Sequence, residues 1–318
     1  MIILRTVKNI SSLNIAASVL LFLAAILAAV VANSSLSPVY QDFLLQELHL
    51  RIGNFNLFSH GGHPLKMIEF INDCLMTVFF LAVGLEIKRE LLVGELSSVR
   101  KAALPFIAAC GGMVVPVVIY ALSVASGTPE TRGMAIPMAT DIAFSLGVLS
   151  LLGKRVPLSL KIFLTAFAVV DDIGGILVIA LFYSADVAYG YLIAAAVLYV
   201  FLYYMGKFGV TQKIFFLFFG VIIWYLFLQS GIHSTISGVI LAFVIPARPR
   251  LDAGKYIERI RDIIGEFPLS KSDNIVLTNA QIATLKQVER ASDYVISPLQ
   301  SLEDNLHGAV SFVNEIGR

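Results

Sequence analysis

Two adjacent carboxylates, Asp171 and Asp172, lie in the middle of an otherwise apolar segment that runs from Leu164 to Ala180. An ionised side chain at the centre of a bilayer costs roughly 2.5–3.5 kcal/mol, so residues of this kind are found facing a cavity or a partner group. No other feature of the chain is so unfavourable in a membrane-spanning segment. The pair therefore predicts an ion or proton site inside a membrane helix.

The composition favours a polytopic membrane protein over a soluble enzyme, because 58% of the 318 residues are apolar and only 14% are charged. The net charge of +1 gives no electrostatic footprint for nucleic acid. Segments of about 20 apolar residues are long enough to cross a bilayer as helices. Eight apolar segments lie near 14–33, 67–87, 103–126, 134–153, 157–183, 188–206, 213–229 and 232–246, of which the last two are short.

Basic residues are distributed unequally between the two sides that alternating spans would create. One side has only Arg51, Lys66 and Arg132. The other side has Arg5, Lys8, Lys88, Arg89, Arg100, Lys101, Lys154, Arg155, Lys207, Lys213 and Arg248. Because cytoplasmic loops are enriched in Lys and Arg, this pattern predicts a cytoplasmic N-terminus.

A proline precedes a further carboxylate in the fourth predicted span, where Pro137 lies four residues before Asp141. Proline removes a backbone hydrogen bond, and a carboxylate after such a break is typical of a discontinuous transporter helix. The alternative is a simple kink in which Asp141 caps the second half-helix. The third span is also expected to be broken, at Pro105, Gly111-Gly112 and Pro116.

The polar residues outside the spans allow more than one interpretation. Glu86 and Glu90, together with Lys88 and Arg89, form a charge cluster at the end of the second span, which an ordinary interfacial anchor would also explain. His233 lies at a membrane edge, where a satisfied interfacial histidine is the simpler interpretation. Alternating apolar residues around Gly53-Asn54 predict a short hairpin, at about 45–65, on the outer side.

The composition divides the chain into three parts. Residues 1–247 form the predicted bundle of about eight helices, and residues 248–305 form a polar cytoplasmic segment. Within that segment, 278–295 has the spacing of an amphipathic helix that ends near Pro298. Residues 306–318 begin another apolar run that is too short to cross a membrane, and they are interpreted as the stub of a ninth span.

Four motifs resemble those of the NhaA-type sodium/proton antiporters, in the family's order and over nearly the whole chain. They are Phe79–Glu90, Ile136–Phe144, Val170–Gly174 and Gly231–Thr235. The resemblance implies an all-α inverted-repeat antiporter of the bacterial inner membrane, which is not an enzyme and uses no cofactor. It also implies that the partners are sodium (or lithium), protons and membrane lipid, with a possible homodimer through the external hairpin and a role in pH and sodium homeostasis.

The resemblance assigns roles to individual residues. Asp172 is implied as the main carrier of sodium and protons, with Asp171 beside it as a second sodium ligand, and Thr140 and Asp141 mark the interrupted helix. The positions linked to pH response are Glu86, Arg89, Glu90, His233, Glu303 and His307. Carboxylates suit this work because their oxygens bind either a proton or a hard cation.

Two alternatives remain open. The family continues with further spans beyond the region of His307, whereas this sequence stops at Arg318, so the second repeat is expected to be cut short. A chain of this length is expected to exchange ions poorly, or to be a non-transporting membrane scaffold. An intramembrane aspartyl protease fits less well, because it needs two aspartates that converge from separate helices, and Asp171 and Asp172 are adjacent.

Overall fold

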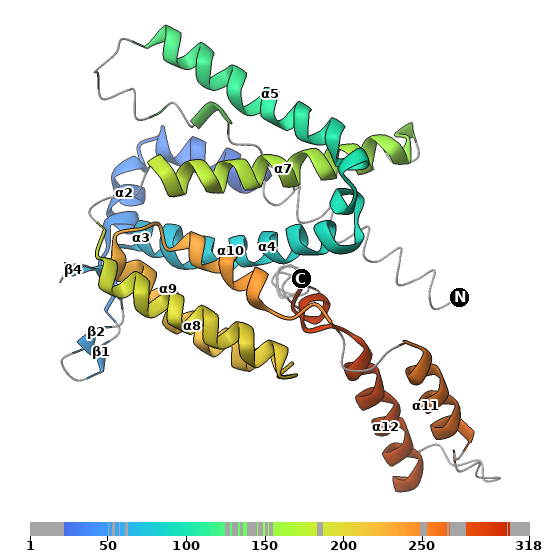
Figure 1. Ribbon diagram of the computed structural model, residues 1–318. Coiled ribbons are helices and arrows are strands. Elements are labelled where there is room, and N and C mark those ends of the chain that lie inside the picture. Colours follow the sequence, from blue (N-terminus) through green and yellow to red (C-terminus); the bar gives the residue numbers. More distant parts are fainter. Residues whose placement is uncertain are drawn as a thin grey trace.

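The computed structural model is an assembly of helices with two small β-hairpins (Figure 1). It describes residues 22–49, 51–52, 55–56, 58–60, 63–124, 128, 133, 136–138, 145, 149, 152, 155–182, 187–248, 253–265, 267, 278–303 and 305. The predicted all-α membrane architecture is confirmed.

The helices follow one another along the chain in the order predicted from hydropathy. A helix Phe22–Ala32 precedes α2 (Ser37–Leu45), and the two are bent by 109° at the break between them. The remaining helices are α3 (Met67–Phe70), the π-helical turn η1 (Ile71–Leu75), α4 (Met76–Val93), the 3₁₀ turn η2 (Glu95–Ser97), α5 (Val99–Ser123), the 3₁₀ turn η4 (Ile136–Met138), α7 (Leu158–Phe182), α8 (Tyr189–Lys207), α9 (Lys213–Ser230), α10 (Thr235–Val244), α11 (Ala253–Gly265) and α12 (Asn279–Val295).

Four helical segments in the described part of the chain are long and apolar enough to cross a membrane, or five if the bent pair at 22–45 is one span. They are Met67–Val93, Val99–Ser123, Tyr189–Lys207 and Lys213–Ser230. α7 is as long as α5, at 25 residues, and carries Asp171 and Asp172. Most of the fourth predicted span, 134–153, lies outside the described residues.

The long helices form three packed pairs, in which α5 lies along α7, α4 along α10, and α8 along α9 (Figure 1). The α4–α10 pair is the tightest, because glycines stand where the two backbones meet. A Cβ atom on Gly84 would lie 2.8 Å from Cβ of Ala242, and one on Gly238 would overlap the carbonyl of Thr77 and lie 3.1 Å from the amide nitrogen of Leu81. Small residues therefore set the distance between α4 and α10.

α5 is one continuous helix, so the prediction of a broken third span was wrong. Pro105 and Pro116 both lie inside it. Each proline removes only one backbone donor, and the remaining hydrogen bonds keep the helix intact, as in many membrane helices. α5 packs on α7 through Gly112, which faces Phe167, and through Met113, whose sulfur lies where a Cβ of Gly174 would be.

The main core lies between α4, α8, α9 and α10. Its fully buried side chains include Leu85, Leu202, Phe216, Ile223 and Ile245. Tyr199 adds a polar link across this core, because its hydroxyl donates to the carbonyl of Ser237 at 2.8 Å. A buried hydroxyl needs such a partner, and here it joins α8 to α10.

Two hairpins lie between α2 and α3. β1 (Arg51–Ile52) pairs antiparallel with β2 (Phe55–Asn56), on either side of the predicted turn Gly53-Asn54. β3 (Ser59–His60) pairs with β4 (His63–Pro64). Leu65, directly after β4, packs against Trp224 and Leu228 of α9, which ties this region to the bundle.

The segment that follows α10 contains more helix than the sequence analysis predicted. α12 covers the expected amphipathic stretch, and α11 precedes it as its neighbour in a helical hairpin. Tyr256 of α11 and Ser292 of α12 share a hydrogen bond of 2.9 Å between their hydroxyl groups. α12 ends at Val295, near Pro298 as predicted, and a new helical segment begins at Pro298 and continues to Glu303.

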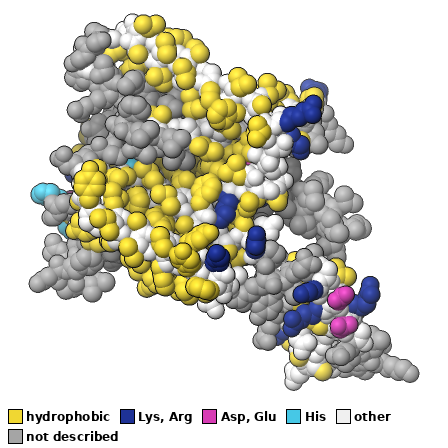
Figure 2. Space-filling model, in the orientation of Figure 1, with side chains coloured by type: hydrophobic (Ala, Val, Ile, Leu, Met, Phe, Trp, Pro, Cys, Tyr) yellow, Lys and Arg dark blue, Asp and Glu magenta, His cyan; other side chains and the backbone are white. Residues whose placement is uncertain are grey.

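The surface separates apolar and basic regions. Hydrophobic side chains cover most of the visible bundle, while Lys and Arg side chains gather toward the end away from the hairpins and on the α11–α12 region (Figure 2). Histidine appears at the hairpin end (Figure 2). This distribution agrees with the unequal charge of the two sides in the sequence.

Replacing Gly238 with valine should destabilise the protein, because the added methyl groups would meet the backbone of α4 at Thr77 and Leu81. Overpacking of this kind costs about 1–3 kcal/mol. Gly111→Val is the matched control, since nothing lies within 4 Å of a Cβ at that position in α5. Thermal unfolding in detergent should show a lower midpoint for Gly238→Val only. Equal midpoints for the two variants would contradict the close α4–α10 contact.

Candidate functional site

The two adjacent aspartates lie on α7, with one of them in the interior. Asp171 is 4% exposed and follows the buried residues Val169 and Val170, whereas Asp172 is half-buried. Successive helical residues point about 100° apart. Asp171 and Asp172 therefore face different surroundings and can take different parts in binding a proton or a cation.

α4 packs against α7 next to these aspartates. Val83 and Ile87 of α4 form a buried cluster with Val169, and Ile173 packs against the same cluster. Val169 is two residues before Asp171, and Ile173 directly follows Asp172. The turn of α7 that carries both carboxylates is therefore packed directly against α4.

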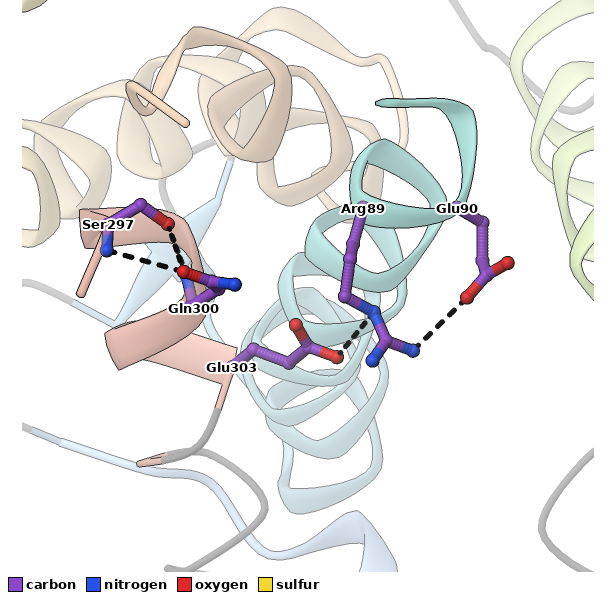
Figure 3. Close-up of polar contacts among 5 residues, drawn as sticks. All are labelled: Arg89, Glu90, Ser297, Gln300 and Glu303. Carbon is purple, nitrogen blue, oxygen red and sulfur yellow. Dashed lines mark hydrogen bonds and ion pairs between the residues drawn. The ribbon is translucent and has the colours of Figure 1, made fainter. Parts of the chain in front are cut away.

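Arg89, Glu90 and Glu303 come together near the C-terminal end of α4 (Figure 3). Arg89 Nη2 donates to Glu90 Oε1 at 3.2 Å, and Arg89 Nε lies 3.3 Å from Glu303 Oε1, a distance that makes an ion pair. The Nε–H does not point at this oxygen well enough for a hydrogen bond. Glu303 is buried and Arg89 is partly exposed, so Arg89 compensates a carboxylate that has lost most of its contact with water.

Local sequence explains why Glu303 reaches α4. Ser297 Oγ accepts from the backbone N–H of Gln300 at 3.2 Å, and Gln300 Oε1 accepts from the backbone N–H of Ser297 at 3.4 Å, which is the reciprocal capping of a helix start. Figure 3 shows the backbone nitrogen and Oγ of Ser297 both meeting Gln300 Oε1. Leu299 and Leu302 are buried in the main core. The capped segment 298–303 therefore docks on the bundle and holds Glu303 beside Arg89.

His233 lies at a different place from this charge cluster. It precedes α10, in the turn that follows Gly231, whose φ of +80° ends α9 in the left-handed conformation that glycine favours. α10 runs parallel to α4, with Ser234 near Asp73 and Ala242 near Gly84. The predicted pH-response residues in the described chain thus fall at opposite ends of α10 rather than in one cluster.

A polar junction around Asp73 was not predicted from the sequence. The carbonyl of Asp73 accepts from Thr77 Oγ1 at 2.6 Å, Trp224 Nε1 at 2.6 Å and Ser234 Oγ at 2.9 Å. Ser234 Oγ also lies 2.9 Å from Asp73 Oδ1. Asp73 belongs to the π-helical turn η1, and π-helical turns are frequent at functional sites. The available signal was a carboxylate in the first turns of an apolar span.

The other predicted site residues divide between the described and the undescribed parts of the chain. Thr140, Asp141 and His307 lie outside the described residues, and Pro137 lies in η4 just before that gap. Glu86 is on α4, half-buried, one turn before Glu90. In the described part of the chain, no three His, Cys, Asp or Glu side chains gather in a way that could hold a metal ion.

The sequence matches the family model described as Na+/H+ antiporter 1 over residues 8–314. The chain belongs to this family. It is 75% identical over 313 residues to a relative from Bacteroides thetaiotaomicron named Na(+)/H(+) antiporter NhaA, covering 98% of this chain and 71% of the relative. Proteins of the same name from Phocaeicola vulgatus and Parabacteroides distasonis are 61% and 50% identical, and the matches cover 91% and 98% of this chain and 64% and 70% of the relatives.

Membership defines the class of protein. Antiporters are transporters and not enzymes, and the apolar helices make this chain a multi-pass membrane protein of bacterial type. The resemblance inferred from the four motifs is therefore confirmed.

Replacing Glu303 with lysine should release the segment 298–303 from α4, because it would place a second cation beside Arg89. The amides of Leu299 and Leu302 should then exchange with deuterium about tenfold faster, which corresponds to ~1.4 kcal/mol. Asn305→Lys is the control, since it introduces the same cationic side chain at an exposed position nearby. If the amides of Leu299 and Leu302 exchanged with deuterium at the same rate in both variants as in the unchanged protein, the Arg89–Glu303 ion pair would not hold this segment.

Proposed function

We propose that this chain exchanges sodium for protons across the bacterial inner membrane. The observation that carries the proposal is the pair Asp171-Asp172 within the apolar helix α7, with Asp171 buried beside the α4 contact. Intramembrane carboxylates of this kind mark ion and proton pathways. The names of the relatives point to the same pair of ions.

The proposed chemistry is a competition for one carboxylate. A protonated Asp172 cannot ligate sodium, whereas an ionised Asp172 offers oxygen ligands to a hard cation. Alternation between these two forms on the two sides of the membrane couples the movement of the ions. Asp171 is proposed to act beside Asp172, and Thr140 and Asp141 are proposed to contribute further polar groups to the ion pathway. Lithium, which is also a hard monovalent cation, is proposed as a second substrate.

The proposed regulation involves the charged end of α4. The residues proposed for the pH response are Glu86, Glu90, Glu303, His233 and His307, together with Arg89, which pairs with Glu90 and Glu303. This response serves pH and sodium homeostasis. Protonation of Glu303 would remove its attraction to Arg89. Because Val83 and Ile87 of α4 pack on Val169, a shift of α4 would reach the turn that carries Asp171 and Asp172.

Asp172→Asn should abolish exchange, because an amide can neither give up a proton nor supply an anionic ligand. The measurement is the sodium-induced collapse of a pH gradient in everted membrane vesicles. Asp42→Asn is the control, as it makes the same chemical change at an exposed position on α2. Exchange by Asp172→Asn at the rate of the control would remove Asp172 from the mechanism. A lack of exchange by the unchanged chain would favour a non-transporting membrane scaffold.

The proposed orientation has a cytoplasmic N-terminus and is tested by single cysteines. Cysteines at Arg100 and Lys154 should be shielded from an impermeant thiol reagent added to intact cells, and cysteines at Asn54 and Thr128 should react. Labelling of the Lys154 cysteine from outside would overturn the proposed topology.

We also propose that two copies associate through the hairpin region, so oxidation of the Asn54 cysteine variant should give a disulfide-linked dimer. Its absence would contradict this dimer.

A further inference from the structure

Lys88 points away from the charge cluster in which the sequence places it. Its Nζ donates to the backbone carbonyls of Phe243 at 2.7 Å and Ala242 at 3.3 Å, and also to that of Ile245. Arg89, the next residue, turns toward Glu90 and Glu303 instead. The two neighbouring cations therefore join α4 to two different parts of the chain.

The carbonyls that Lys88 contacts are those that a helix end leaves without partners. α10 ends at Val244, and the last four carbonyls of any helix lack an intrahelical donor. Pro246 follows closely and has no N–H to offer. A cation at this place also interacts favourably with the negative end of the helix dipole.

The ammonium group of Lys88 and two glycines constrain the packing of α4 against α10 in different ways. Gly84 and Gly238 set how closely α4 and α10 approach, whereas Lys88 fixes how far one helix is displaced along the other. On another side of α4, Val83 and Ile87 pack on Val169 of α7. Ile87 and Lys88 are adjacent, so the residue that supports α7 lies next to the one that holds α10.

We propose that Lys88 is a positioning residue for ion exchange. By holding the carboxyl end of α10, it fixes the register of α4 and, through Ile87 and Val83, the turn of α7 that carries Asp171 and Asp172. This inference rests on the proposed exchange of sodium and protons. It gives Lys88 a role distinct from that of the pH-response residues on the same helix.

The first test separates a positioning role from a merely structural one by transport kinetics. Lys88→Met keeps an unbranched apolar side chain but removes the ammonium, and the KM for sodium should rise about three- to tenfold. Lys88→Arg, which keeps a cationic donor, should retain a KM near that of the unchanged protein. Lys207→Met is the control, because Lys207 is an exposed lysine in the last turn of α8. A purely structural role would reduce the amount of active protein and leave KM unchanged.

The second test does not depend on transport. Cys74 and Cys110 are replaced by alanine, and a cysteine is introduced at Ile245, which is fully buried at the end of α10. N-ethylmaleimide should label this cysteine about tenfold faster when Lys88→Met is added, because a charge-assisted hydrogen bond no longer holds the chain there. A cysteine at Ile223, equally buried in α9, should stay protected in the same background.

The outcomes are distinguishable. A raised KM with faster labelling at Ile245 alone, both reversed by Lys88→Arg, supports the proposal. An unchanged KM, unchanged labelling at Ile245, or labelling of both buried cysteines contradicts it. If the unchanged chain showed no exchange, the proposed function would fail, and the labelling experiment alone would decide whether Lys88 holds α10.

Discussion

The close approach of α4 and α10 is the constraint on which much of the described structure depends. Gly84 and Gly238 leave no room for a side chain between the two backbones. This proximity brings the end of α10 within reach of Lys88 and places Ser234 against Asp73. A larger residue at either glycine would separate the helices and break polar contacts at both ends of α10, in surroundings where few other donors and acceptors are available.

Charge burial at the end of α4 depends on a segment far away in the sequence. Glu303 is buried, and its carboxylate lies next to Arg89 because Leu299 and Leu302 insert into the main core. Lys213 Nζ donates a hydrogen bond of 2.9 Å to Ser301 Oγ, and this bond joins the same segment to α9. Hydrophobic docking thus brings the ion pair together, and a salt bridge of a partly exposed arginine contributes only a modest part of the stability.

The sequence allowed prediction of features that depend on local composition, and less of those that depend on distant partners. Hydropathy located the spans that contain α5, α7, α8 and α9, and the cost of burying charge singled out Asp171 and Asp172. The sequence alone could not show that Lys88 turns toward α10, because the direction of this side chain depends on packing against a segment distant in sequence. Pro105 and Pro116 predicted breaks that the other hydrogen bonds of α5 prevent. Pro298 correctly predicted the end of α12, but the helical segment that starts there, capped by Ser297 and Gln300, was not predicted.

The short run from Ile87 to Arg89 shows how one helical turn can serve several contacts. Successive residues point about 100° apart, so three neighbours face three different directions. Ile87 packs on Val169 of α7, Lys88 donates to the end of α10, and Arg89 pairs with Glu303. A displacement of α4 along its axis would disturb all three contacts together. The charged end of α4 is therefore linked mechanically to the aspartates of α7, because the same rigid turn carries both the ion pair and the apolar support.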